Sequence, residues 1–153
     1  MKNRYTAGFL GLYLVCSIVT KAQEPIPVKQ HIADKPFLFS QLPERSDCIT
    51  KELIQLFRAE LFSGIVIHLP GNHELRGVIT EKVQRSSGIT SINIKLSNYP
   101  GALFNISLNT GSGLTSKING RIIHPQSGDV LILTEENSTY YLKKKLQKFF
   151  MTE

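Results

Sequence analysis

Apolar and polar positions alternate with a period of two through much of the second half of the chain. The runs at residues 89–96 and 102–108 both alternate in this way. In the first run, Ile92 and Ile94 share a face with Leu96. Because successive side chains of a strand point to opposite sides, both runs are predicted to be half-buried β-strands.

Residues 130–133, with the sequence Val-Leu-Ile-Leu, are apolar on both faces. This composition is typical of a strand that is covered on both sides, so we expect it to lie centrally in a sheet. A further β-rich run at residues 139–142 follows the polar break at 135–138. The spacing of short runs and turn residues favours antiparallel hairpins.

A hairpin is also predicted around Pro70, where the apolar-rich runs at 65–69 and 75–83 flank a turn. Gly71 and Asn72 stand between the runs. A glycine at the first central position is typical of a type II′ turn, so we expect a two-residue turn here.

Residues 46–62 have apolar positions at intervals of three and four, which is the spacing of an amphipathic helix. Ser46 or Asp47 is suited to cap its N-terminus. Gly64 is suited to the left-handed conformation that often ends a helix. We therefore expect one helix over 46–62, with its apolar side on the strands that follow.

The elements together predict a mainly β fold with one N-terminal α-helix. About seven short antiparallel strands are expected, as a curved meander, a sandwich or a partly open barrel. Four prolines between residues 24 and 45 disfavour a helix there. We expect an extended leader, within which residues 36–39 pack as an edge strand or a staple.

The N-terminus has the pattern of a secretory signal peptide. Lys2 and Arg4 precede an apolar segment at 9–19, and small residues follow near Ala22. A basic, then apolar, then small-residue order is typical of such signals. The protein is therefore predicted to be secreted or periplasmic after cleavage.

The predicted organisation is a signal peptide at 1–23, an extended leader at 24–45 and a single helix-plus-β domain at 46–153. Contact with a membrane is expected only through the signal segment, if it stays uncleaved or is lipidated at Cys16. Val15 before Cys16 is a poor match to the small residue that a lipidation signal needs.

The formal charge of +6 is partly a property of the predicted signal, because cleavage removes three cations and no acid. The sequence has no basic stripe with interleaved aromatic residues, so nucleic acid is not an expected partner. Cleavage would also leave Cys48 without a partner cysteine. We interpret Cys48 as a small buried apolar residue.

His68 and His73 are candidate metal ligands. In a two-residue turn His68 faces Leu75, and His68 and His73 are diagonal neighbours on one face. The sequence Gly-Asn-His-Glu at residues 71–74 resembles an element of the calcineurin-like metallophosphoesterases, in which Asn and His serve a two-metal site. The resemblance covers these four residues, and the other metal-ligand motifs of that family are absent. It implies a metal-dependent hydrolase, and the predicted hairpin geometry adds His68 to His73 and Glu74 as the candidate site.

No nucleophile with a base, and no other catalytic arrangement, is recognisable, and no cofactor is expected. Tyr99, Tyr140 and Tyr141 are the candidate binding residues, because tyrosine is favoured at interfaces. Alternation places one of Tyr140 and Tyr141 in the core. The leading hypothesis is a non-catalytic binding or accessory module with a protein partner. The alternatives are the metal-dependent hydrolase and an inhibitor or pro-domain that docks on an enzyme by strand addition.

Overall fold

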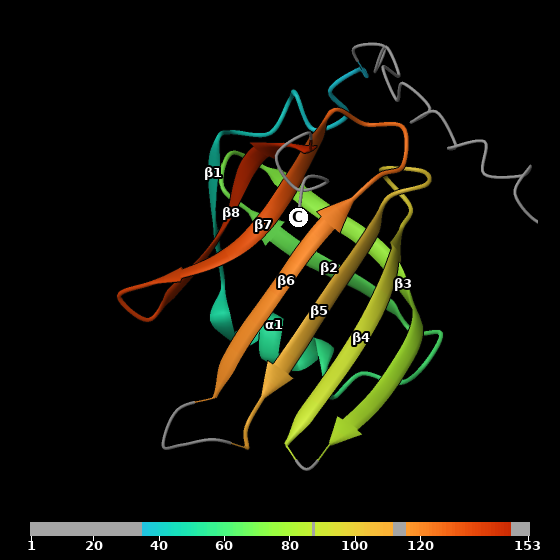
Figure 1. The fold of residues 1–153 in the computed structure, drawn as a ribbon, viewed down its shortest axis with the longest axis vertical. Helices are drawn as coiled ribbons and strands as arrows, with labels where there is room; N and C mark the ends of the chain where they lie inside the picture. Colours follow the sequence, from blue (N-terminus) through green and yellow to red (C-terminus); the bar gives the residue numbers. More distant parts are fainter. Residues whose placement is uncertain (1–34, 87, 112–115, 148–153) are drawn as a thin grey trace, which may run out of the picture. The chain divides into compact units, whose positions relative to one another are not determined.

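A computed structural model describes residues 35–86, 88–111 and 116–147 of the chain. These residues form one antiparallel sheet of eight strands and a short helix (Figure 1). The elements in chain order are β1 (Arg45–Cys48), α1 (Thr50–Leu56), β2 (Gly64–Leu69), β3 (His73–Ser86), β4 (Ile89–Leu96), β5 (Leu103–Asn109), β6 (Lys117–Ile123), β7 (Asp129–Glu136) and β8 (Thr139–Leu146).

The sheet is a meander whose strand order is β1-β8-β7-β6-β5-β4-β3-β2. From β2 to β8 each strand pairs with its neighbour in sequence, and only β1 pairs at a distance, with β8. The sheet curves until its end strands β1 and β2 approach each other, with α1 beside the junction. The prediction of a mainly β fold with a curved, partly open barrel is confirmed.

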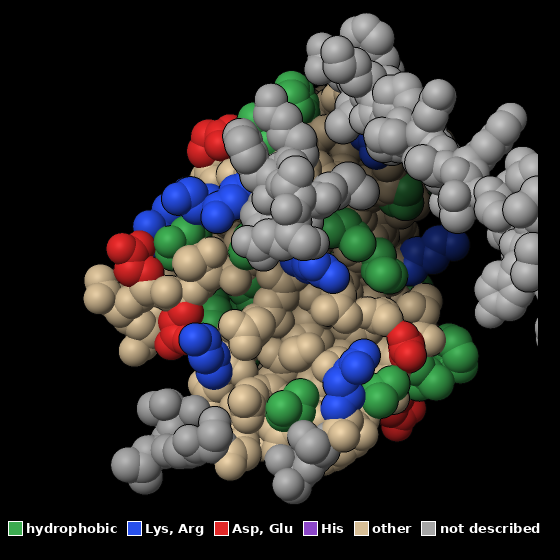
Figure 2. All heavy atoms as spheres, in the orientation of Figure 1, with side chains coloured by type: hydrophobic (Ala, Val, Ile, Leu, Met, Phe, Trp, Pro, Cys, Tyr) green, Lys and Arg blue, Asp and Glu red, His purple; other side chains and the backbone are tan. Residues whose placement is uncertain are grey.

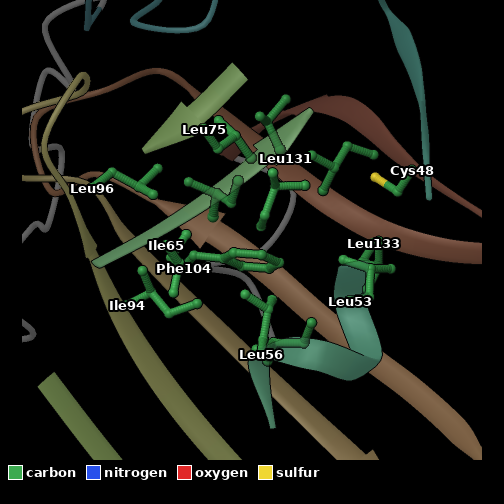
Figure 3. Packing of buried hydrophobic residues seen from close by; sticks show 14 of the residues in the cluster. Cys48, Leu53, Leu56, Ile65, Leu75, Ile94, Leu96, Phe104, Leu131 and Leu133 are labelled. Atoms are coloured by element: carbon green, nitrogen blue, oxygen red, sulfur yellow. The ribbon is translucent and has the colours of Figure 1, made fainter. Parts of the chain in front are cut away.

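The concave side of the sheet holds the hydrophobic core. Ile92, Ile94 and Leu96 of β4 point inward, as their alternation predicted, and Phe104 of β5 is 1% exposed. Figure 3 shows Ile94, Leu96 and Phe104 in one buried cluster that also includes Leu53 and Leu56 of α1. The inward positions are thus filled by aliphatic and aromatic groups, as in small barrels whose interior is a core.

The strand at residues 130–133 is central, as predicted. It lies in β7 between β6 and β8, and Val130 and Leu131 are both buried. Val130 and Leu131 point to opposite sides of the sheet because they are adjacent in a strand. Burial of both explains why neither of these positions is polar.

The predicted helix over 46–62 is wrong at both ends. Residues 45–48 form β1, and α1 begins only at Thr50, with Ile49 as an N-cap that makes no side-chain cap bond. The alternating burial of Ser46 and Cys48 fits the strand. Their pairing with β8 is a contact between distant parts of the sequence, which a local helical period cannot reveal.

The segment at residues 36–42, here called the strap, crosses the end of β7 and β8. The expectation of a staple at 36–39 agrees with this arrangement, because Phe39 and Leu42 are buried in the core. The folded unit therefore starts before residue 46, and the predicted boundary at 45/46 falls inside β1. The predicted signal peptide and Cys16 lie outside the described residues.

Candidate binding surfaces

The hairpin between β2 and β3 has a different register from the predicted one. Leu69 pairs with His73, and His68 pairs with Glu74. Three residues rather than two form the loop, and Gly71 and Asn72 both have positive φ values, of 76° and 61°. The prediction that His68 faces Leu75 is wrong, because a shift of one residue reverses the faces of a strand.

His68 and His73 consequently lie on opposite faces of the hairpin. Glu74 forms an ion pair of 2.6 Å with Arg76. Within residues 35–147, so far as the structure describes them, no group of three or more His, Cys, Asp or Glu side chains is placed to hold a metal. The new register removes the geometric basis of the predicted metal pair.

His68 instead contacts α1. Oε2 of Glu52 accepts a hydrogen bond of 2.9 Å from the His68 backbone N–H, and Oε1 lies 2.9 Å from Nδ1 of the His68 ring. Burial raises the pKa of the Glu52 carboxyl, but the hydrogen bonds from His68 outweigh this effect and lower it overall. Glu52 therefore ties the helix to the outer edge of β2.

The three candidate tyrosines expose little of their rings. Tyr140 belongs to the core, and its hydroxyl accepts a hydrogen bond of 3.1 Å from the Ile118 N–H. The Arg45 guanidinium covers the Tyr141 ring, with its Cζ atom 3.7 Å from the ring centroid. Tyr99 packs against Phe39, with centroids 5.3 Å apart. Burial raises the pKa of both Tyr99 and Tyr140. The three tyrosines therefore offer little exposed surface for the predicted binding role.

Cys48 is a free and buried cysteine, as interpreted from the sequence. It lies in β1 opposite Tyr140 rather than on the helix. Burial raises the pKa of its thiol to about 12. At neutral pH the thiolate, which is the reactive form, is therefore scarce in the folded protein.

The outer edge of β2 lies on the side where β1 and α1 approach it, but no described strand forms hydrogen-bonded pairs with it. β2 ends the sheet, so only β3 pairs with it among the described strands. The His68 N–H points away from β3, toward Glu52. Because N–H and C=O groups alternate in direction along an antiparallel strand, those of Val66 and Gly64 point to the same open side.

An apolar cluster accompanies this edge. Val66 and Val78 are diagonal neighbours on the outer face of β2 and β3, 45% and 39% exposed. Leu61 and Phe62 precede β2 in the chain, and Phe62 is 71% exposed. We call these four residues, Leu61, Phe62, Val66 and Val78, the edge cluster.

Phe62 is held in this exposed position by its backbone. Its φ is 66°, in the left-handed region that a bulky residue rarely adopts. Its N–H donates a hydrogen bond of 2.8 Å to the Ile79 carbonyl, and the Ile79 N–H donates one of 3.1 Å to Ser63. An aromatic ring in a strained, exposed position is a candidate for a binding role.

A pocket of about 480 Å³ lies beside β8 and is lined by Phe37, Ser40, Glu44, Asp129, Lys144, Lys145 and Leu146. Several of its polar groups already serve the fold. Lys144 Nζ donates a hydrogen bond of 2.7 Å to the Leu42 carbonyl, and Asp129 binds the strap. The pocket is therefore a weaker candidate than the β2 edge.

The sequence contained no direct signal for the edge site. Glu52 and Phe62 both fell inside the predicted helix over 46–62, and neither was singled out as a binding residue. The positive φ of Phe62 and the Glu52–His68 contact both depend on the three-dimensional path of residues 57–63, which leave the helix that the apolar spacing predicted. The exposed apolar sequence Leu61-Phe62, just before a strand, is the one local hint.

Comparisons with protein-family models, with curated proteins and with solved structures each found no match to this chain. No helix among the described residues is long and apolar enough to span a membrane.

Proposed function

We propose that the protein is an exported, non-catalytic binding module that takes up an extended segment of a protein partner along the outer edge of β2. The segment adds a strand to the sheet, with main-chain hydrogen bonds to Gly64 and Val66. The edge cluster supplies apolar contacts for alternate side chains of the segment. This is the mode of recognition in which main-chain bonds give affinity and side-chain pockets give specificity.

The observation that carries the proposal is the exposed Phe62 beside an unpaired strand edge. Exposed edges are a hazard that proteins usually cover or protect with charge. The edge cluster around β2 is apolar instead, and the strained backbone of Phe62, which precedes β2, holds one of its side chains in an exposed position. The other end strand, β1, has only four residues and continues directly into α1 after Ile49.

The second candidate function is a special case of the first, an inhibitor or pro-domain whose partner segment belongs to an enzyme. The open edge favours it because strand addition suits such docking. The hydrolase alternative is not retained, since His68 and His73 lie on opposite faces of the hairpin.

The test uses short peptides selected on the purified protein by phage display, followed by calorimetric affinities for three variants. Val66→Pro removes the outward N–H without removing a bond to β3, which an edge strand tolerates. Val66→Thr keeps the N–H and the strand preference, and is the matched control. Phe62→Ala removes the ring, with the exposed Phe37→Ala as its control.

We expect selected peptides to bind the wild type and Val66→Thr alike, and to lose about tenfold in affinity for Val66→Pro, as for one lost hydrogen bond. Phe62→Ala should weaken binding roughly tenfold or more, while Phe37→Ala should not. Peptides that bind Val66→Pro as tightly as the wild type would exclude strand addition at this edge.

A further inference from the structure

The outer face of β4, β5 and β6 carries no acidic side chain. From Lys82 to Gly128 the sequence contains no Asp or Glu. In Figure 2 the face over these three strands is largely tan, which marks backbone and neutral polar groups, with blue cationic side chains among them. We call the outward positions of these strands the acid-free face.

The cations of the acid-free face are spread over two of its strands. Lys95 of β4 and Lys117 and Arg121 of β6 are exposed and alternate with buried residues. On a strand, four residues span about 13 Å, so Lys117 and Arg121 would meet separate charges along an extended ligand. Arg121 forms no ion pair with any residue that the structure describes.

A row of amides leads across the sheet to Arg121. Asn93 pairs with Asn105, and Asn105 pairs with Arg121, on consecutive strands. Nδ2 of Asn105 donates a hydrogen bond of 2.6 Å to Oδ1 of Asn93, and Nδ2 of Asn93 donates one to Glu81 at the margin on β3. These bonds fix the direction of both amides.

Hydroxyl groups lie beside the amides. The Ser91 and Ser107 hydroxyls are 2.8 Å apart on adjacent strands, and the exposed Asn119 pairs with Ser107 in the register. The face thus combines oriented amides, the partly exposed Ser107 hydroxyl and a guanidinium that forms no ion pair with a described residue. Amides and hydroxyls match the hydroxyl groups of sugars, and a guanidinium matches a carboxylate with two parallel hydrogen bonds.

We propose that the acid-free face binds a carboxylate-bearing polysaccharide, with Arg121 on a carboxylate and Asn105 on neighbouring hydroxyls. Lys95 and Lys117 attract further carboxylates of the same chain. The absence of acids on the face removes the repulsion that such a polymer would otherwise meet.

Other polymers fit this face less well. Single-stranded nucleic acid is bound through aromatic side chains on which bases stack, and the outward residues of β4, β5 and β6 include none. Protein interfaces have a core enriched in aromatic residues, and the outward residues of these described strands include none. A hydroxyl-rich polyanion satisfies both the charge and the hydrogen-bonding groups.

The test measures binding of the purified protein to polygalacturonate by calorimetry near physiological salt. Neutral dextran, dextran sulfate and single-stranded DNA are the comparison polymers. Arg121→Gln removes the central charge. Arg121→Lys keeps the charge but cannot donate two parallel hydrogen bonds to one carboxylate. Asn105→Ala removes the side-chain amide. Arg58→Gln changes the same charge at an exposed position after α1 and is the matched control. Thermal melting verifies that each variant is folded.

We expect polygalacturonate to bind and neutral dextran not to bind. Arg121→Gln should lose about tenfold in affinity, Arg121→Lys and Asn105→Ala a smaller factor, and Arg58→Gln nothing. No binding of polygalacturonate would overturn the proposal. Equal or tighter binding of dextran sulfate or DNA, unchanged in Asn105→Ala, would also overturn it, because the face would then attract any polyanion.

Discussion

The strap region and the β2 edge both lie where main-chain groups leave the regular sheet, yet they satisfy these groups in opposite ways. At the strap, the buried Asp129 carboxylate accepts hydrogen bonds of 3.0 Å from the N–H groups of Leu38 and Phe39. The Ser127 hydroxyl donates to Asp129, lies 3.2 Å from the Pro36 carbonyl oxygen, and accepts a hydrogen bond of 3.1 Å from the Leu38 N–H. At the β2 edge, Glu52 accepts a hydrogen bond from the His68 N–H, and the outward main-chain groups of Val66 and Gly64 pair with no described strand.

The difference separates a structural region from a candidate binding region. Asp129 is 1% exposed, so its cost of burial must be offset by the strap that it binds. The edge cluster is exposed and lies beside unpaired main-chain groups, which favours a partner from outside the chain. The predictions below test this contrast from its largest expected effect to its smallest.

Asp129→Ala should lower the free energy of unfolding by about 3 kcal/mol, because it leaves the buried Phe39 N–H without an acceptor and removes one of the two acceptors of the Leu38 N–H. Urea unfolding measures the effect. Asp47→Ala, which removes an exposed carboxylate 3.3 Å from Arg45, is the control and should change stability by less than about 1 kcal/mol. Equal losses in the two variants would mean that the strap does not depend on Asp129.

Glu52→Gln should cost about 1 kcal/mol, since it weakens the bonds to His68. Folding lowers the pKa of Glu52 below its ordinary value of 4.5, so this stabilisation is complete above pH 4.5. It is lost as the pH falls through the lower, folded-state pKa. Unfolding measured across this acidic range should show the loss in the wild type.

The Glu52→Gln variant should lack that component of the pH dependence. Glu60→Gln changes an exposed acid in the following loop and should retain it. If the wild type and Glu52→Gln depend on pH identically below pH 4.5, Glu52 does not tie α1 to β2.

Phe62→Gly should raise stability by up to about 1 kcal/mol, because glycine adopts a positive φ without strain. The same variant should lose affinity for the selected peptides. Leu61→Gly, at a position without positive φ, should not gain stability. A loss of stability in Phe62→Gly would mean that the ring supports the fold rather than a partner.

Local patterns in the sequence were sufficient for most of the sheet. The inward faces at Ile92, Ile94 and Leu96, and the central place of residues 130–133, follow from alternation and from an apolar run. These features depend on residues that are close together in the sequence, so the pattern of apolar and polar positions predicts them. The mainly β class was predicted for the same reason, whereas the curved, partly open barrel was one of the architectures that the predicted strands left open.

Features that depend on distant contacts were not predictable in this way. Residues 45–48 have a strand conformation because β8 pairs with them, and the hairpin register depends on a third loop residue. The candidate site was missed almost entirely. Phe62 lies in an irregular segment, and its exposure follows from bonds to Ile79 on another strand.

Hydrogen exchange of the free protein, followed residue by residue by NMR, tests the central claim most directly. If the β2 edge is open, the amides of Val66 and Gly64 exchange rapidly, while those of Ile65 and Ile67, which bond to β3, are protected. The His68 amide should exchange at an intermediate rate because Glu52 accepts its hydrogen bond. Protection of Val66 equal to that of Ile67 would contradict the account, because the edge would then already be paired.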